Sequence, residues 1–220
     1  MNPTALPRGE IQVDRLGLPS AKSMLVRLFT DRELQIRGLR YSLGLPTPLR
    51  TPDRQVLERI IFPHYLSLPN MRSILFIGVS WYTKHYQEAY FHGLDFWTLD
   101  VDKKVRRFGG SNHVTGAMED LRSHFADGYF DLIICNGVYG HGLNSKDQCE
   151  RAFEGCYACD RAGGYFMLGW NDVPENPGAP LDSIESLRRF RPEPLPQLGT
   201  WRYRVDAPAR HVYDFYRKDE

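Results

Sequence analysis

From residue 72 onward, short apolar runs alternate with segments of helical periodicity along the chain. Apolar runs of this kind, separated by helices, are typical of buried strands in a parallel sheet that is covered on both faces. We therefore expect an α/β fold built on a doubly wound, mostly parallel sheet. The runs expected as strands are 73–77, 96–99, 113–115, 130–135 and 165–169.

The intervening segments 83–91, 145–160 and 181–190 are expected to be helical. The last two apolar runs, 201–205 and 211–216, are separated by a turn and predict an antiparallel pair. These two runs bring the expected sheet to seven strands and close it with an antiparallel last strand.

The first 70 residues lack this alternation and are expected to form an N-terminal helical extension or lid (1–70) ahead of the main domain (71–220). One helix is expected to start at Ser20, where an apolar stripe with the helical period begins. A second is expected to open at Thr51, with Pro52 at its first position, and to be kinked or ended by Pro63.

The composition of the 220 residues is that of an ordinary globular protein, with 42% hydrophobic and 25% charged residues. The 28 basic and 27 acidic side chains leave a net charge of +1, which argues against a partner recognised mainly through phosphate charge, such as nucleic acid. No apolar stretch approaches about 18 residues, so no membrane span is expected. No signal peptide is visible at the start, and the sequence predicts a cytoplasmic protein.

Cys156 and Cys159 have the spacing of a zinc or redox pair, but no second pair of ligands stands at a matching distance along the chain. Together with Cys149 and Phe153, the first of them shares one face of the expected helix at 145–160. The better interpretation is a set of buried, reduced structural thiols, with no metal site.

Ligands of an open parallel sheet bind beyond the carboxyl ends of its strands. The first expected strand ends at Gly78, which permits a tight turn and a close backbone approach ahead of a helix N-terminus. The second ends at Asp100, where a carboxylate can accept hydrogen bonds from both hydroxyls of a ribose. Together these positions outline a site for an adenosine-containing cofactor.

From about residue 72 to the C-terminus, the chain resembles the class I S-adenosylmethionine-dependent methyltransferases, which have a Rossmann-like fold. The resemblance rests on the succession and spacing of five motifs: 74–78 (ILFIG), 98–102 (TLDVD), 116–121 (GAMEDL), 129–136 (YFDLIICN) and 161–168 (RAGGYFML). The expected terminal strand pair also fits that fold. The resemblance implies methyl transfer from S-adenosylmethionine to an acceptor by in-line displacement.

The resemblance also implies which residues bind the cofactor. Asp100 would hold the ribose hydroxyls, and Asn136 would lie beside the methionine part and the transferable methyl group. The adenine would lie against Val101, with Ala117 and Met118 at its edge. The residues implied for the first loop, along the methionine part, are Gly78, Ser80, Tyr82 and Thr83.

A hydroxyl or ammonium acceptor must lose a proton, which favours a nearby histidine, tyrosine or carboxylate. His141, after the fourth strand, is the first candidate for this base, and Asp172, after the fifth, is the second. The acceptor is expected to be a small molecule or biosynthetic intermediate with an oxygen or nitrogen nucleophile, and a carbon nucleophile is also compatible with the sequence. The residues expected to line its pocket are Tyr86, Tyr139, Trp170 and Asn171. For each of them a structural role, in the core or in a turn, stays open.

Two other functions stay open. Ser80 and Tyr82 stand where the family commonly has glycines, and Ala117 where it commonly has an acid, which favours a catalytically silent binding or scaffold protein as the alternative. A nicotinamide-dependent oxidoreductase is disfavoured because glycine is absent at positions 80 and 83. The sequence also leaves open a protein substrate and a homodimer.

Overall fold

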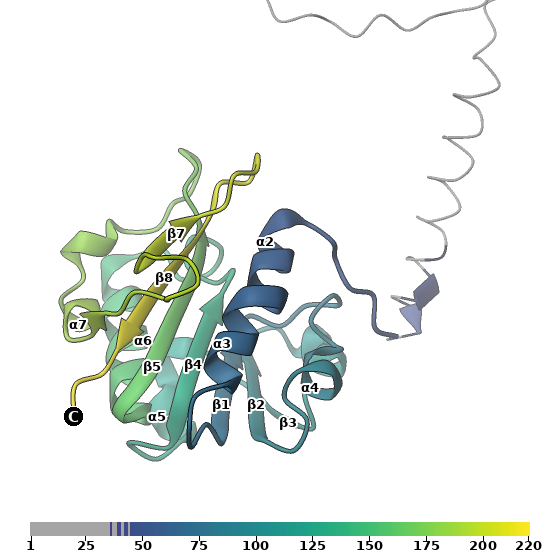
Figure 1. The fold of residues 1–220 in the computed structure, drawn as a ribbon, viewed down its shortest axis with the longest axis horizontal. Helices are drawn as coiled ribbons and strands as arrows, with labels where there is room; N and C mark the ends of the chain where they lie inside the picture. Colours follow the sequence, from purple (N-terminus) through teal and green to yellow (C-terminus); the bar gives the residue numbers. More distant parts are fainter. Residues whose placement is uncertain (1–35, 37–38, 41, 44) are drawn as a thin grey trace, which may run out of the picture. The chain divides into compact units, whose positions relative to one another are not determined.

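The structure, a computed structural model, describes residue 36, residues 39–40 and 42–43, and residues 45–220. The helix expected from Ser20 lies outside these residues. The segment Gly44–Glu220 forms one compact unit. Its sheet has eight strands in the order β3-β2-β1-β4-β5-β8-β6, with β7 also paired to β8 (Figure 1).

The strands are β1 (Ser73–Ile77), β2 (Asp95–Asp100), β3 (Asn112–Thr115), β4 (Phe130–Asn136), β5 (Asp160–Asn171), β6 (Arg191–Pro192), β7 (Arg202–Arg204) and β8 (His211–Arg217). The first five are parallel, and β8 runs antiparallel to β5. The predicted α/β fold and its antiparallel last strand are therefore confirmed. The sheet has one strand more than predicted because the short β6 shares the outer edge of β8 with β7.

One continuous helix crosses the face of the sheet formed by β1 and β4 (Figure 1). It comprises α2 (Pro52–Val56), the π-helical segment η1 (Leu57–Ile61) and α3 (Phe62–Leu66). Of the two outcomes expected at Pro63, a kink or an end of the helix, the second is wrong, because the helix continues past the proline. The π turn immediately before the proline accommodates the missing backbone N–H, so that the helix continues to Leu66. Leu57, Ile61 and Phe62 are fully buried against the sheet.

The opposite face is covered by α6 (Lys146–Cys159), together with η3 (Met118–Asp120) and α5 (Leu121–His124). Ser145 caps α6 through its side chain, which accepts from the backbone N–H of Gln148, while the Gln148 side chain accepts from Ser145 in return. The predicted packing face is confirmed, since Cys149, Phe153 and Cys156 are fully buried. All four cysteines are free and buried.

Two expected helices are shorter than the sequence pattern predicted. The first is only α4 (Tyr86–Ala89), because Thr83 ties the preceding residues into a turn: its hydroxyl accepts from Ser80 N and donates to Ser80 O. The segment 181–190 divides into η4 (Leu181–Ser183) and α7 (Glu185–Arg188). Ile184 between them is extended and fully buried, and the Glu150 carboxylate then caps the start of α7.

Candidate functional site

A cavity of about 410 Å³ lies at the carboxyl ends of β1, β2 and β4, where the strand order of the sheet reverses. It falls in the size range of small-molecule sites in proteins. The residues that line it are Ile77, Gly78, Val79, Ser80, Tyr82, Leu99, Asp100, Val101, Gly116, Ala117, Met118, Glu119, Asn136, Gly137, Val138, His141, Gly142, Leu143 and Gln148. Every cofactor residue predicted from the sequence lines the cavity, with the exception of Thr83.

Gly78 ends β1 in a conformation that only glycine adopts readily, with φ of +97°. A Cβ atom at this position would lie 2.3 Å from the backbone oxygen of Asn136 on the neighbouring strand. The glycine thus allows the chain to turn sharply into the first loop while β1 and β4 stay paired.

Asp100 anchors the loop that follows β1. One carboxylate oxygen accepts from Val79 N at 2.8 Å and the other accepts from Asp102 N at 2.9 Å. A carboxylate has about four lone-pair sites, so each oxygen retains capacity for a further donor. Asp100 can therefore hold the two hydroxyls of a ribose and still fix the backbone beside them.

The rest of the first loop is held by hydrogen bonds between its own residues, unlike a glycine-rich loop with free backbone N–H groups. Thr83 is buried and bonds Ser80, so its role in the structure is to hold the loop. Tyr82 reaches the cavity wall, and the guanidinium of Arg54 stacks over its ring at 4.5 Å.

The far end of the cavity can accept an adenine. Val101 is 71% exposed beside Asp100 and presents an apolar surface there. Ala117 and Met118 also line this end, as predicted. Next to them Glu119 supplies a carboxylate, which accepts from the Gln148 side chain at 3.3 Å. Glu119 and Gln148 were not predicted. The sequence signal available for Glu119 was its position two residues after Ala117, and for Gln148 its position three residues after the N-cap Ser145.

A buried polar network lies behind Asn136, and sequence reasoning missed it. With its amide oriented so that each polar atom has a partner, the Asn136 oxygen accepts from both terminal nitrogens of Arg54 at 3.0 and 3.1 Å. The Asn136 nitrogen then donates to Nε2 of His211 at 3.0 Å. The other ring nitrogen of His211, Nδ1, lies 2.6 Å from the side-chain oxygen of Asn171.

This network connects four elements: the helix α2, the end of β4, the end of β5 and the start of β8. Arg54 is 6% exposed, and its charge is balanced in part by the Asp53 carboxylate, 3.5 Å from Nε. Burial lowers the pKa of His211 to about 4, the charge of Arg54 acts in the same direction, and Asp53 opposes it. The imidazole is therefore neutral at physiological pH.

The predicted base His141 lies on the cavity wall and is exposed. It stands in the loop after β4, in which Gly137 and Gly140 have positive φ. Asp172 lies away from the cavity, on the surface, where it accepts from Arg210 at 2.8 Å and Arg204 at 3.3 Å.

The predicted acceptor residues are dispersed rather than gathered in one pocket. Tyr86 is 1% exposed in the core, and its hydroxyl accepts from Arg54. Asn171 belongs to the network of His211. Tyr139 and Trp170 line a different cavity, where their rings meet edge to face at 5.7 Å. The roles of all these residues stay predictions.

Neither a metal site nor a membrane-spanning helix has support in the part of the chain that the structure describes. No group of three or more metal-ligating side chains occurs among residues 36, 39–40, 42–43 and 45–220. Nor is any helix in those described stretches long and apolar enough to cross a membrane.

Comparison with known proteins agrees with this geometry. Residues 77–168 match the family model of a methyltransferase domain. They contain the first loop, Asp100 and the end of β4. No curated protein matches the sequence significantly.

Solved structures share the fold at low sequence identity. The N-methyltransferase NodS from Bradyrhizobium japonicum WM9 is 16% identical, with a TM-score of 0.55 over 76% of this chain and 97% of that protein. A TehB-like S-adenosylmethionine-dependent methyltransferase from Corynebacterium glutamicum is also 16% identical, with a TM-score of 0.55 over 88% of this chain and 100% of the other. NodS has also been solved in complex with S-adenosylhomocysteine; that structure has a TM-score of 0.50 and 14% identity over 78% of this chain and 94% of NodS.

Proposed function

We propose that this chain is a class I S-adenosylmethionine-dependent methyltransferase and that it methylates an oxygen or nitrogen atom of a small-molecule acceptor. The observation that carries the proposal is the position of Asp100 in the cavity. Asp100 lines the cavity, and each of its two oxygens already accepts from one backbone N–H of the surrounding loops.

The residues present fit S-adenosylmethionine. When bound, this cofactor supplies a methyl group on a positively charged sulfur, which is already a good electrophile. The chain then has to hold the cofactor, align the acceptor and exclude water. Asp100 would hold the ribose, Val101 and Met118 would contact the adenine, and Ser80 and Tyr82 would lie along the methionine part.

The acceptor side of the cavity is formed by Tyr82 and His141. An oxygen or ammonium nucleophile has to lose its proton, and His141 can take it because its ring lies on the wall and is accessible to solvent. Arg54 fixes the Tyr82 ring from behind. We propose His141 as the base, and place no catalytic role on Asp172 because its carboxylate is engaged by two arginines.

Cofactor binding is tested by calorimetric titration of the wild type and of Asp100→Ala with S-adenosylmethionine, S-adenosylhomocysteine and NAD. Loss of the charge-assisted bonds to the ribose should weaken binding by about 1–3 kcal/mol, roughly fivefold to 150-fold in Kd. Asp102→Ala is the matched control: it removes an exposed carboxylate two residues away that caps η2 (Lys103–Phe108) by accepting from Lys104 N. Wild-type affinity in Asp100→Ala would contradict the placement of the ribose.

The acceptor class is tested separately with S-adenosylmethionine carrying a labelled methyl group. The protein is incubated with the small-molecule, protein and nucleic-acid fractions of a cell extract, and the label should appear in the first fraction alone. His141→Ala should bind S-adenosylhomocysteine as the wild type does and transfer the label about a hundredfold or more slowly. His92→Ala, at an exposed position, is its control. Binding without transfer to any fraction would favour the silent binding protein instead.

A further inference from the structure

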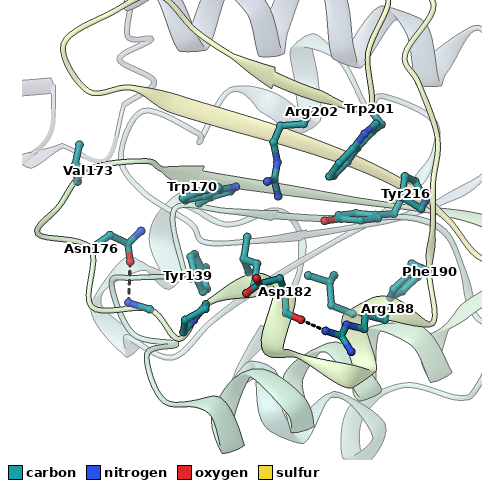
Figure 2. A pocket seen from close by; sticks show the side chains of 15 residues that line it. Tyr139, Trp170, Val173, Asn176, Asp182, Arg188, Phe190, Trp201, Arg202 and Tyr216 are labelled. Carbon is teal, nitrogen blue, oxygen red and sulfur yellow. Dashed lines mark hydrogen bonds between the residues drawn. The ribbon is translucent and has the colours of Figure 1, made fainter.

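A second cavity, of about 650 Å³, lies on the face of the sheet that α6 and α7 cover, beside β5, β8 and β7 (Figure 2). None of the residues that line it lines the cavity at Asp100. The short elements η4 and α7, which follow β5, contribute residues to its lining. The two cavities share one loop, since Tyr139 faces the second and His141 the first.

Five of the fifteen residues that line the second cavity are aromatic. Trp170, Trp201 and Tyr216 come from the sheet side, and Tyr139 and Phe190 from the loop and helix side (Figure 2). The guanidinium of Arg202 lies over the Trp201 ring at 4.7 Å and over the Trp170 ring at 5.7 Å. Flat π surfaces of this kind, with a stacked guanidinium, favour a planar ring system as ligand.

An ion pair between the buried Asp214 and the exposed Arg202 holds these walls in place. Asp214 is fully buried, and it accepts from Arg202 Nε at 2.6 Å, from Arg202 Nη2 at 2.8 Å and from Trp170 Nε1 at 3.0 Å. A buried carboxylate is costly, and a well-packed apolar residue would stabilise the sheet at least as well. What the pair supplies is a fixed orientation of Arg202 and Trp170 toward the cavity, which is the preorganisation that a binding site needs.

The charges of the cavity define the ligand further. Because Asp214 neutralises Arg202, the sheet side offers no net charge to a ligand. On the opposite side, Figure 2 shows Asp182 across the cavity from Arg202, while Arg188 donates to the backbone oxygen of Asp182. The Asp182 side chain is exposed to the cavity and can accept a hydrogen bond from a ligand N–H group.

We propose that this cavity binds a planar, uncharged aromatic molecule that carries an N–H group, at a site separate from the one that binds the methyl donor. The ring system stacks on the guanidinium–tryptophan side of the cavity, and its N–H group donates to Asp182. This proposal does not depend on the acceptor proposed above, because the two cavities have no lining residue in common.

The test uses a fluorescent aminoquinoline that is uncharged at the assay pH, titrated into the full-length protein with energy transfer from tryptophan as the readout. The probe should bind with one-to-one stoichiometry, and saturating S-adenosylhomocysteine should not displace it. Trp201→Leu should weaken binding about three- to tenfold, the scale of one aromatic pair, while Trp81→Leu, outside the cavity, should not. Asp182→Asn should also weaken binding, and the exposed Asp206→Asn is its control.

Leu181→Trp provides an independent variant, because a larger ring at this lining position should fill the cavity and abolish binding. Its fold is checked by circular dichroism and by its affinity for S-adenosylhomocysteine, which should stay at the wild-type value. Displacement of the probe by S-adenosylhomocysteine would overturn the proposal. So would undiminished binding to a folded Leu181→Trp, or no binding of the probe to the wild type at millimolar concentration.

Discussion

The state of His211 predicts how the stability of the protein depends on pH. Its Nδ1 donates to the Asn171 oxygen, and its Nε2 accepts from the Asn136 amide, whose oxygen is turned toward Arg54. A proton on Nε2 would therefore face the Asn136 N–H and add a second charge close to a buried guanidinium. This arrangement explains why the pKa of His211 falls to about 4, with burial as the largest cause.

The sign and size of the effect follow from linkage. A histidine in the unfolded chain has a pKa of about 6.5, so between pH 6.5 and 4 the unfolded state binds a proton that the folded state does not. The contribution is fully present above pH 6.5 and is lost progressively as the pH falls toward 4. The whole difference amounts to about 3 kcal/mol, of which about 2 kcal/mol is lost by pH 5.

The assay is urea unfolding at pH 8 and pH 5, followed by circular dichroism, for the wild type and His211→Gln. The variant should be less stable at pH 8, because part of the network is lost. The difference in free energy of unfolding between the two proteins should shrink by about 2 kcal/mol at pH 5, where the wild type has given up most of this contribution. The exposed His92→Gln should follow the wild type at both pH values. If wild type and His211→Gln lose the same free energy between pH 8 and pH 5, the assignment of a neutral, buried His211 is wrong.

Three further predictions concern positions with a clear structural role. Gly78→Ala should destabilise the fold by about 2 kcal/mol or more and weaken S-adenosylhomocysteine binding, because its Cβ would lie 2.3 Å from the Asn136 oxygen at a positive φ; wild-type values in denaturation and calorimetry would contradict this. Ser145→Ala should cost about 1 kcal/mol of unfolding free energy through loss of the capping box, whereas Ser123→Ala, at an exposed position, should cost little. The four cysteines should not react with a thiol reagent until the protein is unfolded in urea, since all are buried and burial raises the pKa of Cys149 to about 11.

The central strands could be predicted because the local sequence of each strand is apolar enough to indicate that it is buried. β1 contains the apolar run 74–77 and β4 the apolar run 132–135, and both faces of the sheet are covered, so each strand can be recognised from its own sequence. The same reasoning placed Gly78 and Asp100 at neighbouring strand ends, and the parallel register brings them to one cavity. Gly78 and Asp100 share a cavity because the carboxyl ends of neighbouring parallel strands lie at the same edge of the sheet, whatever conformation the following loops adopt.

The loops and the C-terminal segment could not be predicted in the same way, because contacts made far along the chain decide them. The segment 181–190 has a helical pattern, but burial of Ile184 and the cap from Glu150 on α6 divide it. Tyr139 follows β4 and Trp170 lies near the end of the adjacent β5, which favoured a common acceptor pocket with His141. In the structure their rings turn to the opposite side of the loop after β4, toward the aromatic cavity.

Through Arg54, the helix before the sheet contacts residues of the cavity wall as well as covering one face of the sheet. The alternation of apolar runs and helical segments begins near residue 72, which predicted a domain boundary near residue 70. The helix α2 lies before that boundary, and its buried Arg54 guanidinium contacts both Asn136 at the end of β4 and the ring of Tyr82. Without Arg54, the Asn136 oxygen would lose both of its charged donors, and the orientation of its amide toward His211 would no longer be fixed. The wall of the cavity at Asp100 is therefore held in place by residues from α2, β4 and β8 together, and its geometry depends on a segment that precedes the residues matched by the family model.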